Sequence, residues 1–551
     1  MANKDELVFL PLGGSGEIGM NMNCYGFGPP KNRKWVMIDC GVMFGDLSMP
    51  GIELICPDPS FILEENLLGL LLTHGHEDHI GAVALLAPKL QCPVFATPFT
   101  AKLVEAKLLE AGVSVDLRVI NTGARFTLGP FDLEYLTLTH SIPEPSGIAI
   151  RTPITNVLHT GDWKLDPTPT IGPCADEAAI KSFAAEGIST MVCDSTNVFS
   201  TGVSGSETQV KETLATIIKE QKGRVAVTTF ASNFGRVVSI CLAAKDADRS
   251  VCLLGRSMLR IVDAARATGL LPEDITFVSA KEAAYIPREH ILFLCTGSQG
   301  EPRAALSRMA RDDHPDVSLT EGDTVIFSSK VIPGNEREIY TMQNDLVELG
   351  VHLIGEGDAF VHVSGHPNQD ELKKMYGWVE PDFVIPVHGE ARHLERHAEF
   401  AIELGVEGSL SPRNGDLIRI APGDVIVIDE VPNGRLMLDG SHLMPTGSPA
   451  LNERKKLSFA GLVMVSLALE EAGELATTPI VELVGTPTIS GNGELTDALL
   501  VETAEDAFYL LSAGRRRDPV AIETAVTRAV RNRMMETWGK RPIVRVMIHR
   551  V

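Results

Sequence analysis

The segment from Thr73 to His79 brings several metal-ligand side chains together, and they are His74, His76, Asp78 and His79. It follows an apolar run, 67–72, that is short enough to be a buried strand. Imidazole and carboxylate groups are ligands of zinc and manganese, and a turn that leaves a strand can direct several of them at one point. The segment therefore predicts a metal site, and the ligand types disfavour the alternative of surface histidines in a polar turn.

Three more candidate ligands follow predicted strands farther along the chain. His140 follows a strand over 131–139, Asp162 ends a strand and glycine turn at 157–162, and His388 follows a strand over 383–387. Because a β-scaffold presents residues from different strand ends to one place, we expect all three to join the first group.

This combination resembles the metallo-β-lactamase superfamily. The resemblance implies two Zn²⁺ per subunit, with Mn²⁺ or Mg²⁺ able to serve in activity. It implies that His74, His76 and His140 hold one ion, that Asp78, His79 and His388 hold the other, and that Asp162 bridges them. Two ions at such a site can share a hydroxide of lowered pKa and stabilise a phosphodiester during hydrolysis. Asp78 is accordingly a catalytic candidate as well as a ligand.

From Ser206 onward the pattern changes to repeated strand-then-helix units, which predict a parallel α/β domain inserted before His388. Such an insert resembles the β-CASP branch of the superfamily, whose members are nucleases. Asp194 matches its acidic motif and His366 its motif histidine, and a histidine at 388 is typical of the members that act on RNA. We expect Asp194 to orient a histidine. We expect His366 to meet the scissile phosphate as transition-state stabiliser or general acid.

Within this branch the chain resembles the bacterial ribonuclease J family over residues 1–440. The resemblance is carried by 12–21 (LGGSGEIGMN), 51–58 (GIELICPD), 73–79, 229–233 (TFASN), 331–336 (VIPGNE) and 362–367 (HVSGHP). It implies 5′-to-3′ exonuclease activity on RNA with a 5′ monophosphate, endonuclease activity, and roles in RNA turnover and in rRNA and mRNA maturation. It also implies a homodimer or homotetramer that acts with proteins of an RNA-degradation complex.

Two loops carry groups suited to binding phosphate. Ser232 and Asn233 lie between a predicted strand and a predicted helix start, where backbone N–H groups favour an anion. The second loop also precedes a helix, over 369–376, and its candidate residues are His362, Val363, Ser364, Gly365 and His366. The alternative role for Ser364 is to cap that helix or its turn.

The expected fold class is α/β: a metallo-β-lactamase αββα sandwich with an inserted parallel α/β domain and a small C-terminal α+β domain. The expected boundaries place the first part of the sandwich at 1–205, the insert at 206–355, the second part of the sandwich at 356–444, a linker at 445–457 and the C-terminal domain at 458–551.

Residues Gly14 to Gly19 read G-x-G-x-x-G after an apolar strand, and Asp39 ends the next strand, as in a dinucleotide-binding fingerprint. The residues that follow, 21–30, are poor helix formers and predict a strand that ends in a turn. We therefore expect a β-hairpin here, with Asp39 anchoring a loop or a ligand of the metal site.

The chain has 551 residues and a formal net charge of −23, which argues against general charge-driven binding of nucleic acid. Bound divalent cations can still attract phosphate locally. Nine cysteines without a C-x-x-C pair argue against a disulfide framework. The start, residues 1–7, lacks the layout of a signal peptide, and no apolar run is long enough to span a bilayer. We expect a cytoplasmic protein without a membrane partner.

Basic residues cluster near the C-terminus. Two interpretations remain open for them: a solvated helix face that supports self-association, and a surface that contacts RNA. The sequence places no aromatic stacking platform beside them, which favours self-association. These basic residues are Arg515, Arg516, Arg517, Arg528, Arg531, Arg533, Lys540, Arg541, Arg545 and Arg550.

Some histidines have simpler interpretations. His393 and His397 have helical i, i+4 spacing within a charged amphipathic stretch, which predicts an exposed face. His159 is expected to be a satisfied strand residue.

Two alternatives to a ribonuclease remain. One is another dinuclear hydrolase of the superfamily, acting on small thioesters or lactones, against which the large insert and the 362–366 loop argue. The other is a catalytically silent RNA-binding subunit, which the complete set of candidate ligands disfavours.

Overall fold

The structure is a computed structural model that describes residues 5–45, 48–491 and 493–551. Residues 1–4 lie outside the described residues. They belong to the start of the chain, 1–7, for which the sequence predicts no signal peptide. The chain forms two compact units. The first contains Met1–Met43 and Ile55–Arg435, and the second contains Phe44–Leu54 and Leu436–Val551. In the described part of the chain, none of the helices combines the length and apolarity needed to cross a membrane.

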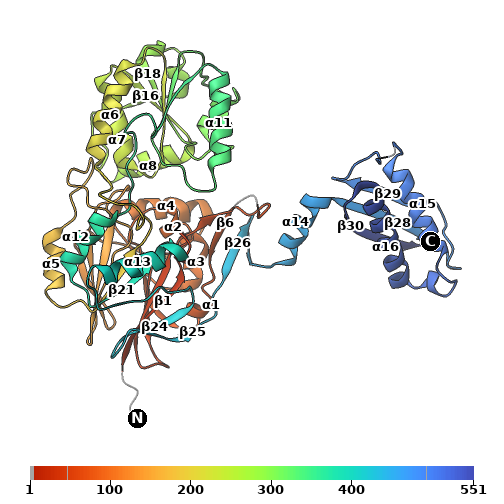
Figure 1. The fold of residues 1–551 in the computed structure, drawn as a ribbon, viewed down its shortest axis with the longest axis horizontal. Helices are drawn as coiled ribbons and strands as arrows, with labels where there is room; N and C mark the ends of the chain where they lie inside the picture. Colours follow the sequence, from red (N-terminus) through yellow and green to blue (C-terminus); the bar gives the residue numbers. More distant parts are fainter. Residues whose placement is uncertain (1–4, 46–47, 492) are drawn as a thin grey trace. The chain divides into compact units, whose positions relative to one another are not determined.

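Two mixed sheets form the sandwich of the first unit (Figure 1). The first sheet has the order β25(Ile426–Glu430)-β24(Asp416–Ala421)-β1(Glu6–Gly13)-β3(Met22–Gly28)-β4(Lys34–Ile38)-β7(Asn66–Leu71)-β8(Val94–Ala96)-β9(Leu117–Val119). The second has the order β10(Arg125–Leu128)-β11(Phe131–Thr137)-β12(Ser146–Arg151)-β13(Asn156–His159)-β14(Thr190–Asp194)-β21(Phe383–Val387)-β23(Gly408–Ser409). Alternating apolar residues such as Phe9, Val36, Tyr135 and Ile385 are buried in one core that both sheets share.

Helices cover the outer faces of this sandwich. The helix α4 (Pro98–Ala111) packs on β8 and β9, and α3 (Val83–Leu90) packs on α4. On the second sheet, α5 (Glu177–Ala184), α12 (Gln369–Val379) and α13 (Ala391–Glu403) bury a second apolar core. The layers are therefore helix, sheet, sheet and helix, and the strand ends that carry the candidate ligands lie at one edge.

The insert is a parallel sheet of order β17(Phe277–Val278)-β16(Ser250–Leu254)-β18(Ile291–Cys295)-β15(Val225–Thr228)-β19(Thr324–Phe327)-β20(His352–Ile354). Helices connect these strands, as the repeated pattern predicts, and the longer ones are α6(Glu207–Glu220), α7(Phe234–Asp246), α8(Arg256–Ala267) and α11(Glu336–Glu348). The helix α8 lies against α4 of the sandwich.

The chain leaves the sandwich after β14 and returns to it at β21, and these two strands are neighbours. They pair in parallel, with Asp194 opposite Val387. Residues separated in sequence by the whole insert therefore lie side by side, and His388 lies next to the end of β14.

The glycine segment at 14–19 forms no helix, as the residues after it predict. The two-residue strand β2 (Ser15–Gly16) pairs with β22 (Gly389–Glu390), and β3 follows. Gly14 and Gly16 have φ values of +88° and +97°, which glycine adopts without strain. The carbonyl oxygen of Gly14 accepts a hydrogen bond from the His388 N–H at 2.7 Å, so this loop fixes the backbone at a candidate ligand.

The C-terminal part of the second unit is a small α+β domain. β28 (Leu462–Leu469) pairs with β29 (Ile480–Val484) and with β30 (Ile543–Arg550), and one face packs on α15 (Thr496–Tyr509) and α16 (Pro519–Trp538). The helix α14 (Pro449–Ala460) occupies most of the segment expected as a linker.

Candidate metal centre

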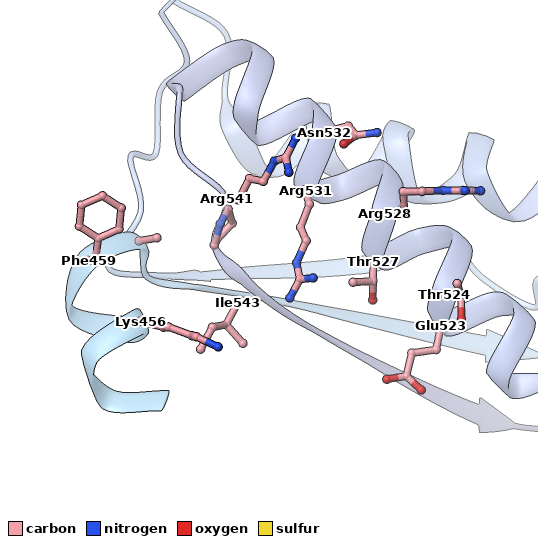
Figure 2. A pocket seen from close by; sticks show the side chains of 12 residues that line it. Lys456, Phe459, Glu523, Thr524, Thr527, Arg528, Arg531, Asn532, Arg541 and Ile543 are labelled. Atoms are coloured by element: carbon pink, nitrogen blue, oxygen red, sulfur yellow. The ribbon is translucent and has the colours of Figure 1, made fainter. Parts of the chain in front are cut away.

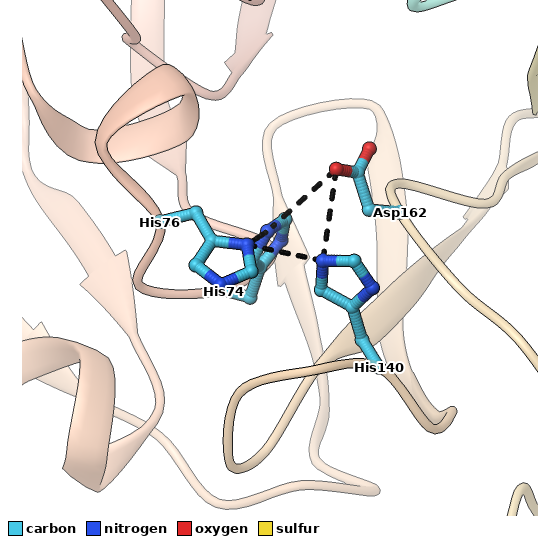
Figure 3. Close-up of side chains that lie close together, drawn as sticks. All are labelled: His74, His76, His140 and Asp162. Carbon is cyan, nitrogen blue, oxygen red and sulfur yellow. Dashed lines mark hydrogen bonds and ion pairs between the residues drawn. The ribbon is translucent and has the colours of Figure 1, made fainter. Parts of the chain in front are cut away.

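Three histidine rings converge beyond the end of the first sheet. His74 and His76 lie on the turn after β7, and His140 lies on the loop after β11. His76 Nδ1 is 3.1 Å from His74 Nε2 and 3.0 Å from His140 Nε2 (Figure 3). Two Zn–N bonds of about 2.0–2.1 Å at a tetrahedral angle place their nitrogens roughly 3.3 Å apart. The spacing therefore suits three ligands of one ion.

A second group lies beside the first and shares Asp162 with it. The short helix α2 (Glu77–Ile80) carries Asp78 and His79, and His388 joins them from the end of β21. Asp162 Oδ2 lies 3.1 Å from His79 Nε2 and 3.5 Å from His388 Nε2. The same oxygen is 3.8 Å from His140 Nε2, which makes Asp162 common to both groups.

The outward-facing ring nitrogens have oxygen partners, which decides the tautomers. The Asp39 carboxylate can only accept, so His79 Nδ1 donates to it at 2.7 Å. His140 Nδ1 donates to the carbonyl oxygen of Gly365. Thr73 Oγ1 donates to Asp39 and lies 3.0 Å from His74 Nδ1. Each of these rings therefore directs an Nε2 lone pair inward, as ligating histidines do. Asp39 has the anchoring contact that its position predicts.

Asn21 is a positioning residue that the sequence reasoning did not assign. Its amide lies 2.8 to 3.0 Å from His388 Nδ1 and donates to the carbonyl oxygen of Asp78 at 3.2 Å. It therefore holds two members of the second group at once. Its place at the end of the glycine segment was the only sequence signal.

The donor set fits a pair of cations. Among the described residues, Asp162 Oδ1 and His388 Nε2 are buried without a hydrogen-bond partner. A buried carboxylate oxygen and an imidazole lone pair left this way are costly unless a cation binds them. Burial, followed by the charge of neighbouring histidines, also holds the pKa values of His74 and His140 well below the ordinary range, so both rings are neutral ligands.

Asp194 and His366 form a dyad at the edge of this cluster. Asp194 Oδ2 accepts from His366 Nδ1 at 2.8 Å, while its Oδ1 accepts from Thr196 N at 2.9 Å. Burial lowers the pKa of His366, but Asp194 and the other carboxylates outweigh it and raise the pKa to about 9. The ring is therefore a charged hydrogen-bond donor at neutral pH. The contact brings Asp194 to a histidine, and its orienting role stays a prediction.

Protein-family models account for most of the chain. Residues 23–183 match the metallo-beta-lactamase superfamily, and 357–411 match a Zn-dependent metallo-hydrolase RNA specificity domain. Residues 222–346 match the ribonuclease J beta-CASP domain, and 449–551 match the ribonuclease J C-terminal domain. A ribonuclease J from Sinorhizobium meliloti is 46% identical over 100% of this chain and 98% of its own length. The chain belongs to the ribonuclease J family.

Other members of the ribonuclease J family are similar over nearly the same length. The protein from Thermus thermophilus is 34% identical over 98% of this chain and 95% of its own length. The protein from Corynebacterium glutamicum is 36% identical over 97% of this chain and 74% of its own length. Membership places the chain among metal-dependent ribonucleases. It confirms the family and the fold class that the sequence predicts.

A solved structure described as a protein of unknown function from Enterococcus faecalis has the same fold over much of the chain. It has a TM-score of 0.54 and 14% identity, and the match covers 75% of this chain and 100% of that one.

The loop 362–366 of this ribonuclease J family member lies between the insert and the metal centre. His362 Nδ1 is buried without a hydrogen-bond partner in the described part of the chain. Burial, and then the Arg236 charge, lowers the pKa of His362 to about 3, so the ring is neutral. Ser364 Oγ accepts from Asn197 Nδ2 at 2.7 Å and from His366 N at 3.2 Å, which is the turn-stabilising role named as its alternative. Val363 is buried.

The two residues of the other predicted phosphate loop differ in their contacts. Asn233 is buried and caps α7, accepting from Arg236 N at 3.0 Å and donating to Glu207 Oε1 at 3.2 Å. Its side chain is therefore occupied within the fold. Ser232 is half-buried, and within the described residues its hydroxyl has no hydrogen-bond partner.

Gly365 touches the metal centre too closely for any side chain. A Cβ at this position would lie 2.7 Å from Cε1 and 2.8 Å from Nδ1 of His140. We expect Gly365→Ala to displace the His140 ring and to weaken zinc binding by about 10- to 100-fold, the range found when a ligand loses its orienting partner. Zinc retained after dialysis against a chelator measures this.

Gly357→Ala is the matched control for that change, because nothing lies within 4 Å of the added carbon. It should retain zinc like the unchanged protein. Equal retention by the two variants would contradict the proposed contact between Gly365 and His140.

The expectation of an exposed histidine face on α13 is wrong. His393 and His397 are both buried, with exposed fractions of 7% and 0%. His397 Nδ1 lies 2.9 Å from Ser195 Oγ and its Nε2 lies 2.9 Å from Tyr376 OH, so both ring nitrogens form hydrogen bonds inside the core. Burial lowers the pKa of His397 to about 4. His159 is a satisfied strand residue as expected, with its Nδ1 3.0 Å from Tyr25 OH.

Proposed function

We propose that this chain is a dizinc ribonuclease that degrades RNA from a 5′-monophosphate end in the 5′-to-3′ direction and also cuts internally. The observation that carries the proposal is the pair of ligand groups that share Asp162 next to the Asp194–His366 dyad. We assign one zinc to His74, His76 and His140 and the other to Asp78, His79 and His388. Mn²⁺ or Mg²⁺ can replace zinc in activity.

The bound ions would supply a water of lowered pKa and positive charge next to the phosphodiester. The protein's own groups do the rest. His366, held by Asp194, donates a hydrogen bond to the scissile phosphate and delivers a proton to the departing oxygen. Asp39, Thr73 and Asn21 keep the ligand rings aimed inward.

We assign recognition of the neighbouring phosphate or the 5′ end to His362, Ser364 and Ser232, with the backbone at Val363 and Gly365. The unpartnered Nδ1 of His362 supports this role, as does the positive charge of Arg236 and Lys330 around that ring. Asn233 contributes by capping α7 and so shaping the loop, in place of direct contact.

The biological setting is part of the same proposal. We propose a cytoplasmic enzyme of RNA turnover and of rRNA and mRNA maturation, assembled as a homodimer or homotetramer and joined by proteins of an RNA-degradation complex. We also propose the domain boundaries stated from the sequence, with 206–355 as the insert.

One RNA that carries a 5′ monophosphate, a 5′ triphosphate or a 5′ hydroxyl, each labelled at the 3′ end, tests the activity. We expect rapid loss of the monophosphate form with release of mononucleotides, because we assign recognition of that end to His362 and its neighbours beside the metal centre. Internal cuts independent of the 5′ end would leave the ribonuclease but remove the roles given to His362 and Ser364.

The same assay decides between the proposal and its alternatives. Turnover of a generic thioester with all three RNAs intact would replace it with another dinuclear hydrolase. Binding of RNA without turnover of any substrate would indicate a silent subunit.

A further inference from the structure

A hollow of about 790 Å³ lies in the C-terminal domain, within the second unit. Figure 2 shows its residues coming from α14, from α16 and from the start of β30. The residues of α16 that line it recur along one side of the helix, whereas Ile522, Val526, Val530 and Met534 on the other side are buried in the domain core. The hollow is therefore a feature of the folded domain and not of a loose segment.

Four cations line the hollow, and they are Lys456, Arg528, Arg531 and Arg541. Within the described residues none of them forms an ion pair or a side-chain hydrogen bond. Other arginines of the domain do have carboxylate partners: Arg545 pairs with Glu453 at 2.5 Å and Arg516 with Glu474 at 3.2 Å. Glu523 also lines the hollow, but among the described residues it forms no ion pair with these four cations, so positive charge is in excess there. Like charges in excess repel one another, and a bound anion relieves that repulsion.

This concentration of positive charge contrasts with the rest of the chain. Residues 449–551 contain 13 Lys and Arg and 13 Asp and Glu, so the net charge of −23 lies entirely in residues 1–448. A polyanion approaching the chain therefore finds its attractive surface outside the metal centre on this domain. Thr527 and Asn532 add uncharged hydrogen-bonding groups to the same hollow.

An aromatic ring completes the hollow. Phe459 is 70% exposed, and Lys540 Nζ lies 4.5 Å from the centre of its ring. The expectation that no aromatic platform accompanies the basic helix is therefore wrong, because α14 brings Phe459 next to it. A cationic groove with an exposed aromatic ring is the combination that holds single strands, phosphates on the cations and a base on the ring.

We propose that this hollow binds a single-stranded segment of RNA and is a second RNA site, made of other residues than the metal centre. The identity of the ligand rests on the proposed function, which makes RNA the substrate. A second copy of this chain is the rival occupant. The composition of the hollow favours RNA, because the buried centres of protein interfaces are depleted in lysine and poor in unpaired charge.

The proposal is tested by measuring, with fluorescence anisotropy, how tightly the full chain binds a long single-stranded RNA. All proteins in this assay carry His76→Ala, so that the RNA is not degraded. Arg528→Gln with Arg531→Gln is expected to weaken binding at least about tenfold and to reduce the slope of log K against log salt by about 1.4, at about 0.7 per lost phosphate contact on a single strand. The loss should be alike for RNAs of different sequence.

Arg533→Gln with Arg550→Gln is the matched control. It removes the same charge from the same domain, but neither residue lines the hollow, and Arg533 already pairs with Glu536 at 3.6 Å. Phe459→Leu keeps an apolar side chain but removes the ring, and should weaken binding about fivefold or more with no change in the salt slope.

The metal centre is assayed separately with a trinucleotide that carries a 5′ monophosphate, supplied at a concentration that saturates cleavage. Here the hollow variants, which are Arg528→Gln with Arg531→Gln and Phe459→Leu, are made without the His76→Ala change, and they should degrade the trinucleotide at an unchanged rate. If the unmodified chain does not degrade it, the proposed function is refuted and not the hollow. Equal RNA binding by the hollow variants and the control variants would overturn the hollow as an RNA site. The proposal would also be overturned if the hollow variants bound RNA normally but no longer formed an oligomer. That result would identify a second copy of the chain as the occupant of the hollow.

Discussion

Replacing Asp162 with asparagine is expected to lower kcat on RNA at least about 1,000-fold while the protein remains folded. The change keeps the shape of the side chain but removes the charge that both ligand groups share. Asp162 Oδ2 lies within 3.9 Å of His74, His79, His140 and His388. Because bound ions contribute several kcal/mol of transition-state stabilisation and each 1.36 kcal/mol is tenfold in rate, a loss of this size follows. Metal content per chain and kcat, measured on the same preparation, check it.

Asp39→Asn is the matched control for Asp162→Asn. Asp39 accepts from His79 Nδ1 at 2.7 Å, but it contacts the outer side of the ring and not the metal position. Its loss should cost about 10- to 100-fold in metal affinity, which excess zinc should restore. Excess zinc should not restore Asp162→Asn. An Asp162→Asn protein that keeps both ions and full activity would refute the shared-ligand arrangement.

The candidate ligands could be predicted from the sequence because each carries a local signal. A dense run of ligand types after an apolar strand, and single ligand types at other strand ends, are visible without knowing the fold. The residues that orient those ligands carry no such signal. Asn21 reaches His388 across 367 positions and the Gly365 carbonyl oxygen reaches His140 across 225, and only the pairing of β14 with β21 and the return of the insert bring them together.

The errors have a common physical origin. The pattern of α13 identifies an amphipathic helix, but periodicity does not say which polar residues on its flank are buried against neighbours, so His397 was expected in solvent. Phe459 has no local signal either, because β28, β29 and α15 separate α14 from α16 in the sequence, and only the folded domain brings the two helices to one hollow. The alternation of strands and helices in the insert follows from local pattern and is predictable, as the parallel sheet found there illustrates.

Arg236 forms a buried ion pair within the insert and also contacts the backbone directly before the 362–366 loop. Its exposed fraction is 0%, and its guanidinium contacts Glu207 through two hydrogen bonds of 2.8 Å. The remaining nitrogen donates to Ser328 O at 2.9 Å and to Val361 O at 3.1 Å, directly before His362. Burial raises the pKa of Glu207, but the Arg236 charge outweighs it and lowers the pKa below its ordinary value, so both partners are charged.

Arg236→Met is expected to reduce the free energy of unfolding by about 3–5 kcal/mol, because it leaves the Glu207 carboxylate buried without its partner. For a unit the size of the insert this corresponds to a fall in Tm of roughly 6–20 °C, measurable by calorimetry. We also expect the Michaelis constant for 5′-monophosphate RNA to rise, because the backbone before His362 loses its donor.

Two further variants separate the buried pair from a general effect of removing charge. Lys245→Met removes a cation from the same helix that pairs with Asp274 at the surface, at 2.8 Å, and should cost less than about 1 kcal/mol. Combining Arg236→Met with Glu207→Leu removes both buried charges and should recover much of the lost stability, since an apolar pair of similar volume can replace a buried ion pair. A double variant as unstable as Arg236→Met alone would mean that the contacts to Ser328 and Val361, and not the stranded carboxylate, dominate the loss.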